Sequence, residues 1–98
     1  MEYKIEFSQK AFQDLEAIKN YIYDRNKTAS REVVKYIIDK IETFLAPNPC
    51  CGRAGRVPGT RELVLTKYPY IIPYLVKKDV IYIVRVLHTS RKWQNNLE

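Results

Sequence analysis

The first segment of the chain alternates between apolar and polar positions. In residues 3–8, YKIEFS, an extended backbone places Tyr3, Ile5 and Phe7 on one side and the charged residues on the other. This period of two predicts a β-strand with one buried face. Ser8 then offers a side-chain oxygen that can cap a helix.

Two longer segments carry apolar residues at spacings of three and four, the period of an amphipathic helix. The first runs from Gln9 to about Tyr23, and the second begins after a cap at Thr28 or Ser30 and ends at Pro47. Their apolar stripes comprise Ala11, Leu15, Ile18 and Ile22 in the first, and Val34, Ile37, Ile38, Ile41, Phe44 and Leu45 in the second. The polar turn DRNKTAS joins them, so we expect an antiparallel helical hairpin.

The second half of the chain changes to strand-like segments after a loop. Residues 47–59 hold three of the five prolines and all three glycines, a composition that predicts loop. Strands are expected at residues 60–66, 70–77 and 80–88. The KKDV turn makes the last two a hairpin, and Pro73 places a bulge or a locally unpaired side in the middle strand. The last strand is apolar on both faces, as in the centre of a sheet.

The order strand, helix, helix, strand, strand, strand is that of the α+β class. We predict an N-terminal strand and a helical hairpin packed on a small, mainly antiparallel four-stranded sheet. A chain of 98 residues has room for one core, so residues 1–96 are assigned to a single domain. Leu97 and Glu98 have the composition of an expression-tag remnant and take no part in the functional prediction.

Charge and composition narrow the range of partners. The net charge of +6 on so small a domain favours an acidic or polyanionic partner, although solubility alone also explains it. No apolar run approaches the ~20 residues of a membrane helix, and the N-terminus lacks the layout of a signal peptide. We therefore expect a cytoplasmic protein. With one histidine, and two adjacent cysteines that are expected to be reduced loop thiols, no metal or cofactor site is predicted.

The run VIYIVRVLHTSRKW, residues 80–93, ends an apolar strand in a cluster of polar and aromatic groups. It contains the only histidine and the only tryptophan of the chain. An imidazole can transfer a proton near neutral pH, and guanidinium groups stabilise the charge that develops on a phosphate. For RNA cleavage by 2′-OH attack, the candidate catalytic residues are Arg61, Arg85, His88 and Arg91. Candidate nucleic-acid-binding residues, which supply phosphate contacts and stacking surfaces, are Arg53, Arg56, Lys67, Tyr70, Lys92 and Trp93.

Each of these residues also has a structural interpretation. A histidine at the end of a strand is more often hydrogen-bonded within the fold than catalytic. Arg85 could pair with Glu62 across the sheet, and Trp93 could close the hydrophobic core. The loop arginines could simply be solvated charges. The sequence does not identify which face of the sheet the helices leave open.

Three segments, GTREL, PYIIPY and IVRVLHTSRKW, together resemble the RelE/ParE toxin superfamily of bacterial type II toxin–antitoxin systems. The N-terminal strand and helix pair fit the same superfamily. The resemblance implies a toxin that is held inactive by a cognate antitoxin wrapped around it. It also implies one of two activities, because RelE-like members cleave mRNA in the ribosomal A site without a metal, whereas ParE-like members inhibit DNA gyrase and are not nucleases.

We predict that the toxin is a metal-independent, ribosome-dependent mRNA endonuclease that blocks translation, with the ribosome and mRNA as partners. The SRKW segment is closer to nuclease-type relatives. The chain departs from the best-known ribonuclease pattern because it lacks a clear terminal helix with a late tyrosine and many lysines. The alternative is a ParE-like inhibitor of DNA gyrase that is not an enzyme. A degenerate member that only binds nucleic acid or an antitoxin is the third hypothesis.

Overall fold

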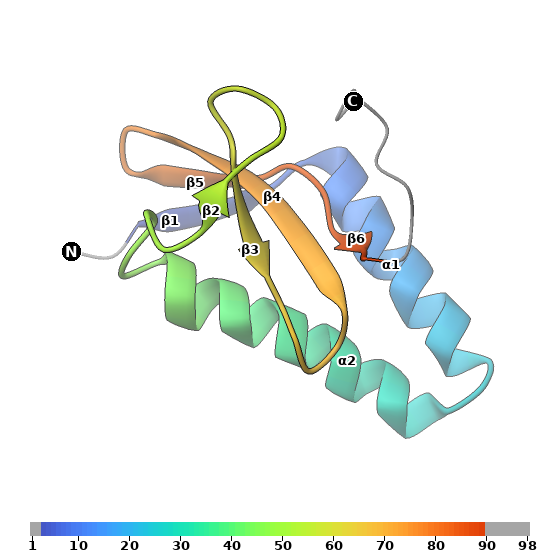
Figure 1. The fold of residues 1–98 in the computed structure, drawn as a ribbon. Coiled ribbons are helices and arrows are strands. Elements are labelled where there is room, and N and C mark those ends of the chain that lie inside the picture. The colour runs from blue at the N-terminus through green and yellow to red at the C-terminus, as the bar shows by residue number, and fades with distance from the viewer. Residues whose placement is uncertain (1–2, 90–98) are drawn as a thin grey trace.

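The computed structural model describes residues 3–89 of the chain, and Figure 1 shows how its helices and strands are arranged. The elements in order are β1 (Lys4–Phe7), α1 (Gln9–Tyr23), α2 (Lys27–Lys40), the π-helical turn η1 (Ile41–Leu45), β2 (Arg53–Ala54), β3 (Arg61–Val64), β4 (Tyr70–Lys77), β5 (Val80–Ile83) and β6 (Leu87–His88). Within residues 3–89, none of the helices combines the length and the apolar character that crossing a membrane requires.

The strands of residues 3–89 form one six-stranded sheet in the order β1-β5-β4-β3-β2, and β6 pairs with β4. β1 lies parallel to β5, and the other pairings among the described strands are antiparallel. The predicted α+β class and mainly antiparallel sheet are confirmed. The predicted number of four strands was too low. The short strand β2 forms inside the expected loop, where Arg53 pairs with Glu62 of β3, and β6 is separated from β5.

The core lies between the helical hairpin and one face of the sheet (Figure 1). The helices contribute Ala11, Leu15, Val33, Ile37, Ile41 and Leu45, and the sheet side contributes Leu63, Leu65, Tyr70, Ile72, Tyr74, Ile81, Ile83 and Val86. The predicted apolar stripes therefore mostly face inward. Phe44 is an exception at 45% exposure. The line of buried residues runs through Ile37, Ile41 and Leu45, and Phe44 lies beside it on the outer side of η1.

Side-chain oxygens begin both helices. The hydroxyl of Ser8 accepts the N–H of Ala11 at 2.9 Å, which confirms the predicted cap of α1. Asn26, rather than Thr28 or Ser30, caps α2. Ser30 is instead buried, and its hydroxyl donates to a backbone carbonyl of α1 at 2.8 Å. This hydrogen bond ties the two helices together near their turn.

The strand predicted over residues 80–88 is interrupted. β5 pairs with β4 up to Ile83, which lies opposite Tyr74, and pairing resumes in β6 with Leu87 opposite Ile71. The segment between them holds one residue more than the facing part of β4, as in a β-bulge. The extra residue reverses the alternation of side chains, so Val86, rather than Arg85, follows Ile81 and Ile83 into the core.

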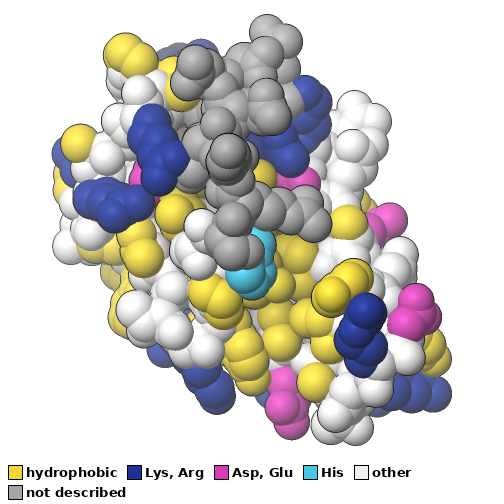
Figure 2. All heavy atoms as spheres, turned by 45° about the vertical axis from the view of Figure 1, so that its right-hand side comes forward, with side chains coloured by type: hydrophobic (Ala, Val, Ile, Leu, Met, Phe, Trp, Pro, Cys, Tyr) yellow, Lys and Arg dark blue, Asp and Glu magenta, His cyan; other side chains and the backbone are white. Residues whose placement is uncertain are grey.

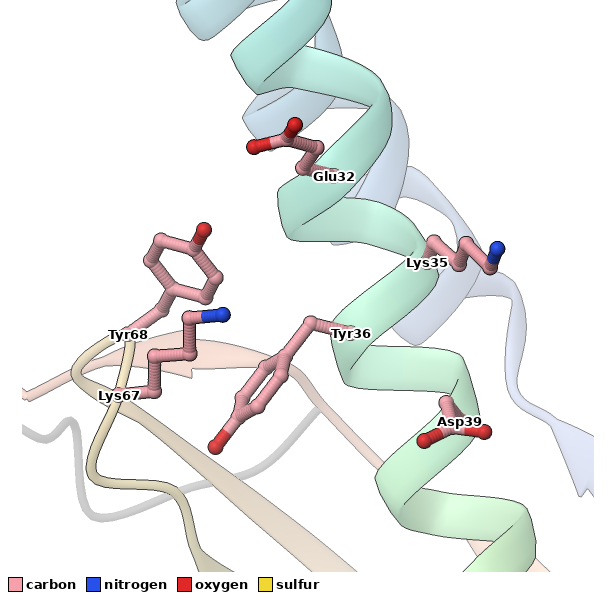
Figure 3. A pocket seen from close by; sticks show the side chains of 6 residues that line it. All are labelled: Glu32, Lys35, Tyr36, Asp39, Lys67 and Tyr68. Carbon is pink, nitrogen blue, oxygen red and sulfur yellow. The ribbon is translucent and has the colours of Figure 1, made fainter.

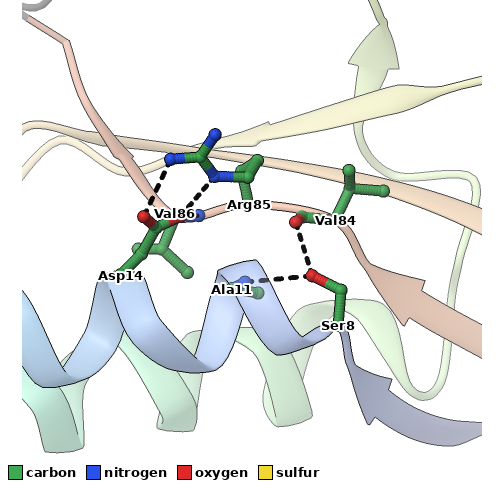
Figure 4. A network of polar contacts seen from close by, with 6 residues as sticks. All are labelled: Ser8, Ala11, Asp14, Val84, Arg85 and Val86. Carbon is green, nitrogen blue, oxygen red and sulfur yellow. Dashed lines mark hydrogen bonds and ion pairs between the residues drawn. The ribbon is translucent and has the colours of Figure 1, made fainter. Parts of the chain in front are cut away.

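Side chains from the N-cap and the second turn of α1 contact the interrupted segment (Figure 4). The hydroxyl of Ser8 donates to the carbonyl of Val84 at 2.7 Å, and the carboxylate of Asp14 accepts the N–H of Val86 at 3.0 Å. These backbone groups are thus satisfied by helix side chains instead of a neighbouring strand. Val86 turns into the core, where it is 2% exposed.

Candidate functional site

Two of the predicted catalytic residues lie on different strands and at different positions along β4. Arg61 of β3 pairs with Tyr74, whereas His88 of β6 pairs with Tyr70. Four residues of a strand span about 13 Å, and β3 and β6 flank β4 on opposite sides. The fold therefore does not bring the backbones of Arg61 and His88 together around one phosphate-sized space. Residues 91–93, which hold Arg91, Lys92 and Trp93, lie outside the described residues.

Arg61 anchors the loop that precedes β2. Its Nη1 donates to the carbonyl of Gly52 at 2.9 Å and to that of Cys50 at 3.4 Å. The buried hydroxyl of Tyr74 holds the same loop, because it accepts the N–H of Gly52 at 2.9 Å and donates to the carbonyl of Pro49 at 2.7 Å. Burial raises the pKa of Tyr74, which keeps the hydroxyl protonated and able to donate. Gly52 is required here, since an added Cβ would lie 2.5 Å from that hydroxyl oxygen.

Arg85 forms an ion pair with Asp14 on α1. The guanidinium donates from Nε to Oδ2 at 2.7 Å and from Nη2 to Oδ1 at 2.9 Å (Figure 4). These hydrogen bonds are the main reason that the pKa of Arg85 is raised. The alternative that Arg85 pairs with Glu62 is wrong. The arginine instead joins α1 to the segment between β5 and β6.

Glu62 of β3 accepts hydrogen bonds from both arginines of the predicted loop, Arg53 and Arg56. Its side chain is 2% exposed, and its Oε1 accepts from Nε and Nη2 of Arg53 at 3.1 and 3.0 Å. The other oxygen, Oε2, accepts the backbone N–H of Arg56 at 3.3 Å. A buried carboxylate needs such partners, so the head group of Arg53 has a structural role in this fold.

His88 lies half-buried at the end of β6, beside apolar side chains on the face shown in Figure 2. Its ring meets the ring of Tyr70 edge to face, with centroids 5.3 Å apart and an interplanar angle of 87°. Tyr70 is 7% exposed and belongs to the core. Its burial leaves little ring surface for the base stacking that the sequence suggested.

Lys67 belongs to a feature that the sequence prediction missed, an aromatic–lysine strip formed by Phe44, Lys40, Tyr36, Lys67 and Tyr68. The Nζ of Lys40 lies 5.0 and 5.5 Å from the ring centroids of Phe44 and Tyr36. The Nζ of Lys67 lies 5.6 and 5.5 Å from those of Tyr36 and Tyr68. The two tyrosine rings meet edge to face at 5.1 Å. The four-residue spacing of Tyr36, Lys40 and Phe44 on a helix was the available signal.

A depression of about 420 Å³ opens beside the strip, between α2 and the turn before β4 (Figure 3). Its lining adds Glu32, Lys35 and Asp39 to three residues of the strip. The tyrosine and lysine side chains of the turn point toward α2, while the ammonium group of Lys35 points away (Figure 3). Tyrosine is one of the residue types enriched among those that dominate protein–protein binding, so this surface suits a side chain of a protein partner.

Comparison with known proteins assigns the chain to a family. The family described as "ParE toxin of type II toxin-antitoxin system, parDE" matches residues 5–93. The chain belongs to this ParE toxin family. Among its relatives is Y4kP, a candidate toxin of Sinorhizobium fredii, with 39% identity over 90 residues that cover 92% of each chain. The predicted membership of the RelE/ParE superfamily is confirmed.

Solved structures agree with this assignment. A chain from the chromosomal ParDE toxin–antitoxin system of P. aeruginosa is 27% identical, with a TM-score of 0.80, over 90% of this chain and 97% of the other. Two further chains share the fold at 18% identity. One, from the RelBE2 complex of Mycobacterium tuberculosis, has a TM-score of 0.67 over 90% of this chain and 99% of the other. The second, from the E. coli RelBE complex, has a TM-score of 0.56 over 91% of this chain and 99% of the other.

Proposed function

We propose that this ParE-family toxin inhibits DNA gyrase by binding it, and that it cleaves no nucleic acid itself. The observation that carries the proposal is the match to the ParE family over residues 5–93. ParE-like members of the superfamily inhibit DNA gyrase and are not nucleases. Membership of the ParE family therefore favours this non-enzymatic activity over the endonuclease that the sequence prediction placed first.

The local structure of the candidate catalytic residues supports the same choice. Arg61 anchors a loop, Arg85 pairs with Asp14, and His88 packs against Tyr70. Each of these three residues thus has a structural role in the fold. A ribonuclease would need an acid–base group and cations around one phosphate, and the contacts of these three residues within the fold favour the binding mechanism instead.

A binding mechanism needs a surface that a protein can recognise, and the aromatic–lysine strip is a candidate. Phe44 is 45% exposed, and the adjoining depression is lined by two tyrosines and by charges of both signs. Aromatic side chains carry large contact areas at small entropic cost, which makes them frequent binding hot spots. We assign gyrase contact to the strip.

The proposed partner that restrains the toxin is a cognate antitoxin. The ParDE and RelBE neighbours come from toxin–antitoxin systems. The net charge of +6 is complementary to an acidic protein, and such complementarity speeds association and selects partners. An acidic antitoxin encoded beside the toxin is therefore expected.

The ribosome-dependent mRNA endonuclease remains the second candidate function. The observation in its favour is the half-buried imidazole of His88, which lies shortly before the basic residues Arg91 and Lys92 in the sequence. In this case residues 88–92 would supply the acid–base group and the cations. The RelBE neighbours share the fold, but at 18% sequence identity this likeness does not extend to their activity.

Two assays with the same purified protein test the proposal. DNA supercoiling by gyrase is followed as toxin is added, and mRNA 5′ ends are mapped on programmed ribosomes. We expect loss of supercoiling and intact mRNA, and gyrase should keep its supercoiling activity when antitoxin is added first. Cleaved mRNA with unaffected gyrase would refute the proposal and support the endonuclease.

A further inference from the structure

The turn of the helical hairpin carries an exposed group of cations and tyrosines away from the core. Figure 1 shows this turn projecting beyond the sheet. Tyr21 and Tyr23, in the last turn of α1, are 63% and 46% exposed. Arg25 and Lys27 follow within the next four residues and are also exposed. We call these four residues the hairpin-tip cluster.

Each tyrosine of the hairpin-tip cluster is paired with one of its cations. The Cζ of Arg25 lies 4.1 Å from the ring centroid of Tyr21, and its Nη1 donates to the carbonyl of Tyr21 at 3.3 Å. The Nζ of Lys27 lies 5.6 Å from the ring centroid of Tyr23. A guanidinium held over a ring keeps its remaining N–H groups in a fixed fork that matches phosphate oxygens. The contacts thus pre-orient Arg25 for an anion.

Charge around the turn favours a polyanion. Residues 19–31 contain four Lys or Arg residues and a single acidic residue, Asp24. Half of the net charge of +6 is therefore concentrated in this short segment. The aromatic–lysine strip differs in this respect, because Glu32 and Asp39 adjoin it.

The position of Lys27 adds a second argument. It is the first residue of α2, and the first turn of that helix holds no acidic residue. The N-terminal end of a helix carries partial positive charge, which disfavours a cation and favours an anion. Lys27 and the helix end would therefore attract the same phosphate group.

We propose that the hairpin-tip cluster is a contact site for single-stranded nucleic acid. Arg25 and Lys27 contact successive phosphates, and the open sides of the Tyr21 and Tyr23 rings stack on bases. Interleaved cations and aromatic rings are the usual elements of such sites. The carboxylates of an acidic peptide would pair with the two cations, but such a peptide has no planar group to stack on the two exposed rings. Nucleic acid offers both phosphates and bases, so it fits the cluster better. The inference does not depend on whether gyrase or the ribosome is the target.

Fluorescence anisotropy with labelled single-stranded 20-nucleotide DNA and RNA tests the site in the full chain. The variant Arg25→Gln/Lys27→Gln removes two charges at the tip. Lys10→Gln/Lys77→Gln is the matched control, because these exposed lysines lie at the opposite end of α1 and at the end of β4. We expect the tip variant to lose about tenfold or more in affinity. Its salt dependence should fall by about 1.4 in log–log slope, as for two lost phosphate contacts on a single strand. The control should lose less than about threefold, since screening weakens distant charges.

The variant Tyr21→Ser/Tyr23→Ser separates stacking from charge. We expect it to lose about fivefold or more on single strands while changing little on a duplex of the same sequence. Circular dichroism checks that each variant is folded. Equal losses in the tip variant and its control would mean a net-charge effect and would overturn the site. So would a preference of the tip for a poly-glutamate peptide over the oligonucleotides, or an absence of binding by the unaltered chain.

Discussion

Asp14 and Arg85 are 71 positions apart in the sequence and form a two-point ion pair, with distances of 2.7 and 2.9 Å. The same carboxylate also accepts the N–H of Val86. One side chain of α1 therefore fixes both the guanidinium and the backbone of the segment that joins β5 to β6. This contact holds the segment that leads directly into β6, where His88 pairs with Tyr70 of β4.

Replacing Asp14 should destabilise the fold more than an ordinary surface substitution. In Asp14→Ala, the guanidinium of Arg85 loses its ion-pair partner. The N–H of Val86, a residue of the core, loses its hydrogen-bond acceptor. We expect a loss of about 1–3 kcal/mol in the free energy of unfolding. Urea denaturation measures it, with Glu16→Ala, an exposed position on the same helix, as the control. Equal midpoints for the two variants would show that the ion pair contributes nothing to stability.

The fold class could be predicted from local pattern because strand and helix periods appear directly in the residues they bury. Residues 3–8 and the two amphipathic segments needed no information from elsewhere in the chain. The break between β5 and β6 could not be predicted this way. Residues 80–87 are continuously apolar apart from Arg85. The groups that interrupt the strand, Ser8 and Asp14, come from the other end of the chain.

The candidate site was harder to predict for a related reason. The sequence shows that arginines are present but not which carboxylates they meet. Glu62 was considered for Arg85, yet the register places it beside Arg53, and Asp14 takes Arg85. Tyr70 shares one face of β4 with Ile72 and Tyr74, and that face packs on the core. Apolar residues occupy both faces of this strand, so the sequence alone did not indicate which face is turned inward.

Tyr74 should make stability fall at alkaline pH. Burial raises its pKa above the ordinary value of 10.0 in the folded state. The stabilising effect is complete below pH 10, where the hydroxyl is protonated in both states, and it is lost as the pH rises through the folded pKa. Denaturation midpoints between pH 8 and 11 measure the decline.

The variant Tyr74→Phe isolates this residue. It removes the hydroxyl that bonds Gly52 and Pro49, so it should cost about 1–3 kcal/mol at neutral pH and make the alkaline decline shallower. Tyr82→Phe, at a half-buried position on β5, is the matched control. An unchanged alkaline slope in Tyr74→Phe would contradict the assignment of the titration to this hydroxyl.

His88 tests whether the toxin uses proton transfer. His88→Phe keeps a ring that can meet Tyr70 but has no titratable group, whereas His88→Gln removes the ring. If the toxin acts by binding, His88→Phe should arrest growth as the unaltered chain does, at equal protein levels measured by immunoblot. A catalytic imidazole would instead make both variants lose about a hundredfold or more in activity, which would favour the endonuclease.

Lys67 and Lys35 provide a matched test of the aromatic–lysine strip, because both are exposed lysines that line the same depression. Of these two lysines, Lys67 lies over the rings of Tyr36 and Tyr68, whereas the ammonium group of Lys35 points away from the depression (Figure 3). Lys67→Gln removes a cation that the rings hold in place for a protein partner, so inhibition of gyrase should weaken by about fivefold or more, the range of a moderate hot spot. Lys35→Gln makes the same change in charge and should leave the inhibition constant within about twofold, as expected for a rim position. Equal effects would place gyrase contact elsewhere on the toxin, and a loss of antitoxin binding in Lys67→Gln with unchanged gyrase inhibition would reassign the strip to the antitoxin.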